Sequence, residues 1–115
     1  MPQLQNFRTV IVTDRRDTNK YRGLAVHIMA RWYKDLYDIR DKLTLHITVN
    51  NDDIEITLTQ YDSELDTIET ILSICFLSLS DMAFFEKNGC RKTSVLGMRI
   101  LKGGDKQSFS GIDFC

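Results

Sequence analysis

Hydrophobic and polar residues alternate along two neighbouring stretches in the middle of the chain. From Leu43 to Val49, Leu, Ile and Val occupy every second position, and the positions between them hold Thr or His. The same alternation runs from Ile54 to Thr59. Because side chains of a strand point alternately to its two faces, each stretch predicts a strand with one apolar and one polar face. Together they predict an antiparallel hairpin that is covered on one face only.

The residues between these two strands set the pairing of the hairpin. Asn51 and Asp52 are predicted to form a two-residue turn, because Asn and Asp accept the unusual backbone angles of such turns. The opposite positions are then Val49–Ile54, Ile47–Ile56, Leu45–Leu58, Thr48–Glu55, His46–Thr57 and Thr44–Thr59. A shift by one residue would bury threonine and expose isoleucine, so the sequence specifies this register strongly.

The chain before the hairpin predicts a strand and a helix. Residues 7–13 form a short segment rich in β-branched side chains, which favours a strand. Residues 20–39 carry apolar side chains at steps of three and four, which indicates an amphipathic helix. Thr18 or Asn19 is suited to cap the first turn of this helix.

The chain after the hairpin predicts a second helix and two further strands. Residues 63–88 are apolar on nearly every side, so we expect a heavily covered helix that Ser63 caps and Gly89 ends. Residues 94–101 and 107–114 are expected to be strands, joined by a glycine-containing hairpin loop.

These elements predict an α+β fold in a single compact domain that spans residues 1–115 without a linker. The expected order is strand, helix, strand, strand, helix, strand, strand. We expect an antiparallel sheet of about five strands, covered on one face by the two helices.

Composition narrows the class of protein without specifying a reaction. Hydrophobic residues at 43% and charged residues at 27% are typical of a soluble globular domain. A net charge of −1 argues against a strongly basic nucleic-acid binder. We expect no secretion signal and no transmembrane segment, because neither a signal-peptide pattern nor a long apolar run occurs. The three cysteines match no zinc spacing and favour a reducing, cytosolic compartment.

Candidate catalytic and cofactor-binding groups are few. His27 lies among basic residues of the first helix and His46 lies on the polar face of the hairpin. Glu55 is diagonal to His46, and a solvated cross-strand pair explains this arrangement better than catalysis does. Residues 51–53 lack the spacing of a calcium loop, and residues 103–108 lack the lysine–serine core of a phosphate loop. We therefore expect no enzymatic activity, no metal and no cofactor.

Two candidate interaction surfaces follow from the pattern. A basic surface is expected on the first helix and several loop tips, either as a contact for phosphates or anionic lipid or as an ordinary solvated face. Its candidate residues are Arg15, Arg16, Lys20, His27, Arg31, Lys34, Lys87, Arg91 and Lys92. An assembly surface is expected from helix aromatics and the polar face of the hairpin, with packing of its helix onto the sheet as the favoured alternative for Trp32. Its candidate residues are Trp32, Tyr33, Tyr37, Thr44, His46, Thr48, Thr57 and Thr59.

Several segments resemble one protein family. Residues 22–37, with a small apolar start, a tryptophan and a later tyrosine, resemble the first helix of rhabdovirus matrix proteins of the vesiculovirus type. Residues 53–65 resemble the late strand of that family and the acidic turn after it. Residues 81–87 and 96–102 resemble the end of its last helix and the strand beyond.

The resemblance implies a non-enzymatic structural protein that self-associates, condenses the nucleocapsid and contacts the inner face of a membrane during budding. We accordingly expect a small viral matrix-type protein of the virion and the host cytoplasm. Expected partners are further copies of the chain and a viral nucleoprotein or host protein, with anionic membrane and nucleic acid as additional candidates. The alternative is a binding module of ferredoxin-like topology that binds single-stranded RNA or inhibits a host protein.

Overall fold

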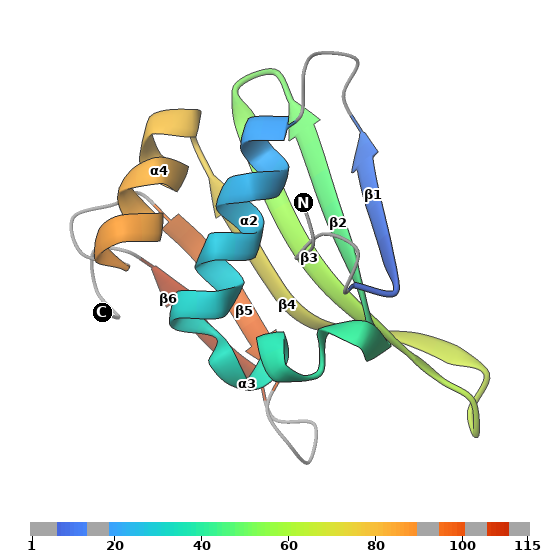
Figure 1. The fold of residues 1–115 in the computed structure, drawn as a ribbon. Coiled ribbons are helices and arrows are strands. Elements are labelled where there is room, and N and C mark those ends of the chain that lie inside the picture. Colours follow the sequence, from blue (N-terminus) through green and yellow to red (C-terminus); the bar gives the residue numbers. More distant parts are fainter. Residues whose placement is uncertain (1–6, 14–18, 90–94, 101–105, 111–115) are drawn as a thin grey trace.

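A six-stranded sheet forms the body of the protein, and its strands lie side by side in the order in which they occur in the chain (Figure 1). The computed structural model describes residues 7–13, 19–89, 95–100 and 106–110, with side chains for the first two ranges. The strands are β1 (Thr9–Thr13), β2 (Leu43–Asn50), β3 (Asp53–Asp62), β4 (Thr67–Phe76), β5 (Val95–Ile100) and β6 (Lys106–Ser110). β1 runs parallel to β2, and each later pair is antiparallel.

The helices of the described residues lie on one face of this sheet (Figure 1). They are α2 (Asn19–Trp32), α3 (Lys34–Asp38), the short 3-10 helix η1 (Arg40–Lys42) and α4 (Leu79–Asn88). The predicted α+β class is therefore confirmed. The sheet has more strands than the predicted number of about five, and its first pair is parallel.

The central hairpin adopts the register that its sequence predicts. All of the predicted pairs occur between β2 and β3, from Val49–Ile54 at the turn to Thr44–Thr59 at the far end. Asn51 takes a φ of 57° in the turn, which is the left-handed region that Asn tolerates. The apolar rows of both strands belong to the core, in which Val49 is partly buried and the other members are fully buried.

The second predicted helix is wrong over its first half. Residues 67–76 form β4, which lies between β3 and β5 in the middle of the sheet. This segment is rich in Thr and Ile, and β-branched side chains favour strands over helices. Ile71 and Cys75 add apolar side chains to those of the buried Leu72, Ile74 and Phe76, so the segment forms a nearly continuous apolar run that periodicity does not distinguish from a buried helix.

The second helix consequently starts later, and a different serine caps it. The Ser78 hydroxyl accepts a hydrogen bond of 3.1 Å from the backbone amide of Asp81, which satisfies one of the unpaired donors of the first turn of α4. Ser63, the predicted cap, lies instead in the turn between β3 and β4. Gly89 ends α4 with a φ of 71°, and its prediction as the terminating residue is confirmed.

The first predicted helix is divided at Tyr33. This residue has φ −130° and ψ 53°, outside the helical region, and it separates α2 from α3. Asn19 begins α2, whereas Thr18 and the loop between the last two strands lie outside the described residues. The strand order also contradicts a ferredoxin-like topology, since β1 lies at an edge of the sheet instead of beside β3 at its centre.

The core fills the space between the sheet and its helix layer. Phe76 of β4 and Phe85 of α4 meet edge to face, with ring centroids 5.3 Å apart, a favourable arrangement for aromatic pairs. The largest fully buried side chains are Phe76, Phe85, Ile28, Met29, Leu43, Leu45, Ile47, Ile54, Ile56, Leu58, Leu72 and Ile74. They come from α2, α4 and the strands β2, β3 and β4, so these helices pack directly on one face of the sheet.

Candidate functional site

The face of the sheet opposite the helices carries mostly short polar side chains. We call it the threonine face, and the strand register assigns to it Thr9, Ile11, Thr13, Thr44, His46, Thr48, Glu55, Thr57, Thr59, Tyr61, Ile68, Thr70, Ser73 and Cys75. Asn50 and Asp53 continue the same rows at the turn end of β2 and β3, so the acidic residues of this face are Asp53 and Glu55. No described helix covers this face (Figure 1).

Three large apolar side chains are exposed on the threonine face near β1. Ile11 is 44% exposed, Tyr61 42% and Ile68 72%. The hollow between them, of about 250 Å³, is lined by Arg8, Thr9, Ile11, Thr44, His46, Tyr61 and Ile68. An apolar patch with a polar rim is typical of a surface that contacts another protein.

Polar contacts orient the side chains around this hollow. His46 Nε2 lies 2.9 Å from Thr59 Oγ1, and the guanidinium carbon of Arg8 lies 5.7 Å from the centre of the Tyr61 ring, within cation–π range. The Tyr61 hydroxyl donates a hydrogen bond of 2.7 Å to Asp66 Oδ1. This hydrogen bond raises the pKa of Tyr61, and desolvation adds to the effect. The hollow is therefore bordered by side chains with fixed partners.

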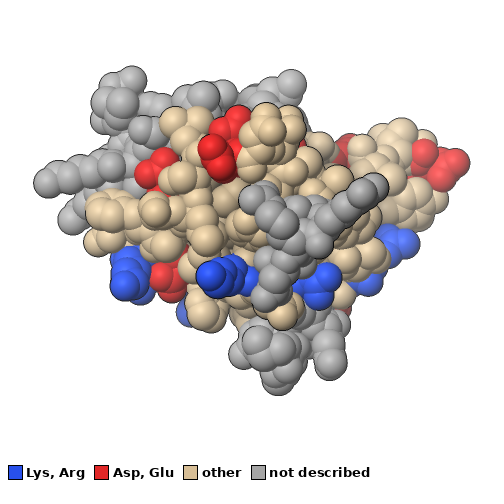
Figure 2. All heavy atoms as spheres, turned by 90° about the horizontal axis from the view of Figure 1, so that it is seen from above, with Lys and Arg blue, Asp and Glu red and all other residues tan. Residues whose placement is uncertain are grey.

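The β3–β4 hairpin continues beyond its neighbours as a two-stranded arm (Figure 1). β2 pairs with β3 as far as Gln60, and residues 61–68 form the arm. Asp62 Oδ1 accepts hydrogen bonds from the amides of Glu64 and Leu65, at 2.9 and 3.3 Å, and thereby shapes the turn. Leu65 is 66% exposed at the tip. Asp and Glu side chains gather at this projecting end of the molecule, on the right in Figure 2.

The structure divides the predicted assembly surface between two sides of the protein. It brings together on the threonine face Thr44, His46, Thr48, Thr57 and Thr59. The three aromatic residues belong to the helix layer instead. Tyr33 is buried in the core, Tyr37 lies 4.1 Å from the guanidinium carbon of Arg40, and Trp32 is 41% exposed. The two halves therefore do not form one continuous surface.

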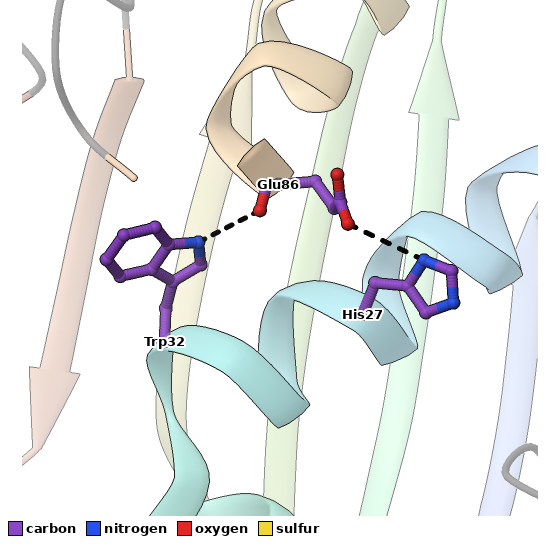
Figure 3. A network of polar contacts seen from close by, with 3 residues as sticks. All are labelled: His27, Trp32 and Glu86. Atoms are coloured by element: carbon purple, nitrogen blue, oxygen red, sulfur yellow. Dashed lines mark hydrogen bonds and ion pairs between the residues drawn. The ribbon is translucent and has the colours of Figure 1, made fainter. Parts of the chain in front are cut away.

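Trp32 connects α2 to α4 (Figure 3). Its indole Nε1 donates a hydrogen bond of 3.2 Å to the backbone oxygen of Glu86. His27 Nδ1 lies 3.7 Å from Glu86 Oε1, so the same residue of α4 meets α2 at two points. The indole also lies against Gly89, and its ring centroid is 6.4 Å from that of Phe85. These contacts show that the Trp32 side chain packs α2 against α4.

The predicted basic surface lies in part on the outer side of the helix layer. The exposed residues there are Lys20, His27, Arg31, Lys34 and Lys87. Lys and Arg side chains are spread along one side of the molecule in Figure 2. The remaining candidates lie outside the described residues, namely Arg15, Arg16, Arg91 and Lys92. The candidates that the structure describes thus belong to α2, α3 and α4, and none of them is on a strand of the sheet.

Cys75 is half-buried on the threonine face. Burial raises the pKa of its thiol, and the negative charges of Asp53 and Glu55 raise it further. Because the thiolate is the reactive form, a raised pKa makes this cysteine a poor nucleophile at neutral pH.

The exposed apolar part of the surface is not identifiable from sequence. Ile68 falls within the stretch that predicts a helix, and the predicted strand containing Ile11 has no assigned neighbour. Tyr61 offers the only local signal, because it continues the polar row of Thr57 and Thr59 at a step of two. Strand pairing is needed to bring the three side chains together.

Within the described ranges, no three or more His, Cys, Asp and Glu side chains are grouped so that they could hold a metal ion. No helix of the same ranges has the length and apolar character needed to cross a membrane. Comparisons of the chain with protein families, curated proteins and solved structures found no match. The resemblance to rhabdovirus matrix proteins therefore stays a prediction.

Proposed function

We propose that this chain is a non-enzymatic structural protein of the matrix type, which self-associates through its threonine face. The observation that carries the proposal is the exposed cluster of Ile11, Tyr61 and Ile68 on a sheet face that no described helix covers. Monomeric soluble proteins rarely leave contiguous apolar patches open to water, and such patches commonly mark protein contacts.

The surroundings of this cluster suit a protein partner. Interface centres are poor in charge and rich in aromatic residues, and Tyr61 offers an aromatic side chain beside the hollow of about 250 Å³. Threonine contributes a methyl group for apolar contact and a hydroxyl that can form hydrogen bonds with a partner. The acidic residues of this face, Asp53 and Glu55, lie at the other end of β3 from Tyr61, so Arg8 is the charged residue that lines the hollow.

The helix layer supplies a second, basic surface on the other side of the sheet. Lys20, Arg31 and Lys34 are exposed there, and such side chains attract phosphate groups in a salt-dependent way. In a matrix-type protein, this surface would meet the nucleocapsid while the threonine face meets further copies. The resemblance of several segments to that family supports this assignment of roles.

Sedimentation velocity at rising protein concentration tests the self-association. We expect the wild-type chain to form assemblies, and Ile68→Lys to raise the concentration needed for assembly at least tenfold. Leu77→Lys is the matched control, because Leu77 is 52% exposed but lies between β4 and α4, at the other end of β4 from Ile68. A wild-type chain that stays monomeric at every concentration would contradict the proposal.

The basic surface is tested separately by binding to single-stranded RNA and to phosphatidylserine vesicles at rising salt. We expect Lys34→Glu to weaken binding to the nucleic acid and to leave self-association unchanged. If Lys34→Glu binds as tightly as the wild type, the anionic partner contacts another surface.

A further inference from the structure

Among the described residues, β1 lacks three of the usual features that protect an edge strand, namely a charged residue, a proline and a bulge. β1 stands at one end of the strand order and pairs with β2 alone among the described strands. Its sequence, Thr-Val-Ile-Val-Thr, contains no lysine, no proline and no other charged residue. Natural edge strands usually carry such residues or a bulge, because an open edge is a template for pairing with another chain.

The backbone of β1 presents hydrogen-bonding groups to this edge. The amide of Arg8 donates to the carbonyl oxygen of Leu43 at 3.0 Å, so the backbone groups of Leu43 point to β1. The direction of the backbone N–H and C=O groups alternates along a strand, so the odd-numbered residues of β2 all point to β1. In the observed parallel register, they form hydrogen bonds with the odd-numbered residues of β1. The backbone groups of Val10 and Val12 therefore point away from β2, toward the outer edge.

The sequence of β1 is a palindrome, and it therefore complements a second copy of itself. In an antiparallel pair centred on Ile11, Val10 lies opposite Val12 of the second copy, and Thr9 lies opposite Thr13 of the second copy. The outward-pointing valines then form the hydrogen-bonded pairs, and Ile11 meets its own copy in a non-hydrogen-bonded pair. The threonines and the isoleucine of β1 lie on the threonine face, and its two valines lie on the face that the helices cover. Threonine therefore meets threonine on one face, and valine meets valine on the other.

We infer that two copies of the chain pair through β1 about a two-fold axis at Ile11 and join their sheets edge to edge. The inference rests on the proposed self-association and names one of its contacts. A symmetric contact requires a surface that complements itself, and the palindrome supplies this in a single register. A shift by one residue would oppose valine to threonine or isoleucine and would misalign the outward-pointing backbone groups.

Disulfide formation between engineered cysteines tests the register directly. In a chain whose native cysteines are changed to serine, Ile11→Cys is expected to form disulfide dimers in a glutathione buffer. Cα atoms of a non-hydrogen-bonded antiparallel pair are about 4.5 Å apart, within the range of about 4.4–6.8 Å that a disulfide bridges.

Thr9→Cys is the matched control. In the proposed pair, position 9 of one copy lies four residues along the strand from position 9 of the other, which is too far for a disulfide. Thr9→Cys alone should therefore cross-link at least tenfold more slowly than Ile11→Cys. A mixture of Thr9→Cys and Thr13→Cys chains should cross-link, because these positions face each other. Ile11→Cys combined with Ile68→Lys should also still cross-link, since Ile68 lies on β4, away from this edge.

The outcomes separate this inference from the proposed function. A wild-type chain that assembles while Ile11→Cys and Thr9→Cys cross-link equally would overturn the edge pairing and leave self-association standing. A monomeric wild-type chain without cross-linking at Ile11 would overturn both. If the serine background does not fold, sedimentation of Ile11→Lys with native cysteines decides. This change sets two ammonium groups side by side at the axis, and association as strong as that of the wild type would overturn the pairing.

Discussion

Replacing Gly89 with alanine is expected to destabilise the protein at the junction of α2 and α4. Gly89 has φ 71° and ψ −147°, a combination that glycine adopts readily and that strains residues with a Cβ atom. An added Cβ would also lie 3.0 Å from Cη2 of Trp32 and 3.1 Å from two further ring atoms. The substitution therefore combines backbone strain with a clash against the indole.

The two effects can be given magnitudes. A residue forced into such a backbone region costs about 1–3 kcal/mol. Relief of the clash requires the indole to move, which weakens its 3.2 Å hydrogen bond to Glu86, a contact worth about 1 kcal/mol. We expect the free energy of unfolding to fall by about 2–4 kcal/mol, a large fraction of the stability of about 6–17 kcal/mol usual for a chain of this size.

Urea unfolding followed by tryptophan fluorescence measures this effect, because Trp32 is the only tryptophan. Gly23→Ala is the matched control: no atom lies within 4 Å of its added Cβ, and in the middle of α2 the change should stabilise by about 0.5–1 kcal/mol. In a Trp32→Ala background followed by circular dichroism, the cost of Gly89→Ala should fall to the strain alone. Equal stability of Gly89→Ala and the wild type, with unchanged emission, would refute the reasoning.

Three smaller predictions follow from individual contacts. Ser78→Ala should lower the free energy of unfolding by about 1 kcal/mol through loss of the helix cap, whereas Ser63→Ala should change it by less than about 0.5 kcal/mol. A larger effect of Ser63→Ala than of Ser78→Ala would instead support a helix that begins at Ser63. The raised pKa of Tyr61 should keep its phenol protonated to higher pH than an ordinary tyrosine in an ultraviolet titration, and Asp66→Asn should remove most of that difference. The raised pKa of Cys75 leaves less thiolate at pH 8 than in an ordinary cysteine, so Cys75 should react more slowly with a thiol reagent until the chain unfolds. Equal rates before and after unfolding would contradict its raised pKa.

The parts of the fold that sequence predicts correctly are those in which local signals agree. In the hairpin, the period of two, the Asn51 turn and the burial of one face all specify the same register. β4 is mispredicted because Ile71 and Cys75 are apolar although they are not buried, so the alternation of the buried Leu72, Ile74 and Phe76 is obscured in the sequence. The break at Tyr33 is likewise set by packing, since the ring is buried where the helix ends.

The candidate site is predictable to the extent that it depends on a single hairpin. Thr44, His46 and Thr57 share a face because strand alternation requires it. The apolar cluster joins Ile11 of β1 to Ile68 of β4, and these lie far apart in the chain. For Trp32 the sequence leaves two roles open, packing of its helix and an assembly surface. In the structure, its indole hydrogen-bonds the backbone oxygen of Glu86 and lies against Gly89, which has no Cβ.

Edge pairing through β1 would give the assembly a defined polarity. Ile11 of both copies lies on the same face in the proposed pair, so the two-fold axis stands perpendicular to the sheet. The two threonine faces then join into one surface, and both helix layers lie on the opposite side with their exposed lysines and arginines. A layer built from such dimers would present a threonine-rich, apolar-centred surface on one side and the exposed lysines and arginines of the helices on the other. A protein that must bind its own copies and an anionic partner at the same time needs this separation, because charge repulsion between copies would otherwise oppose their association.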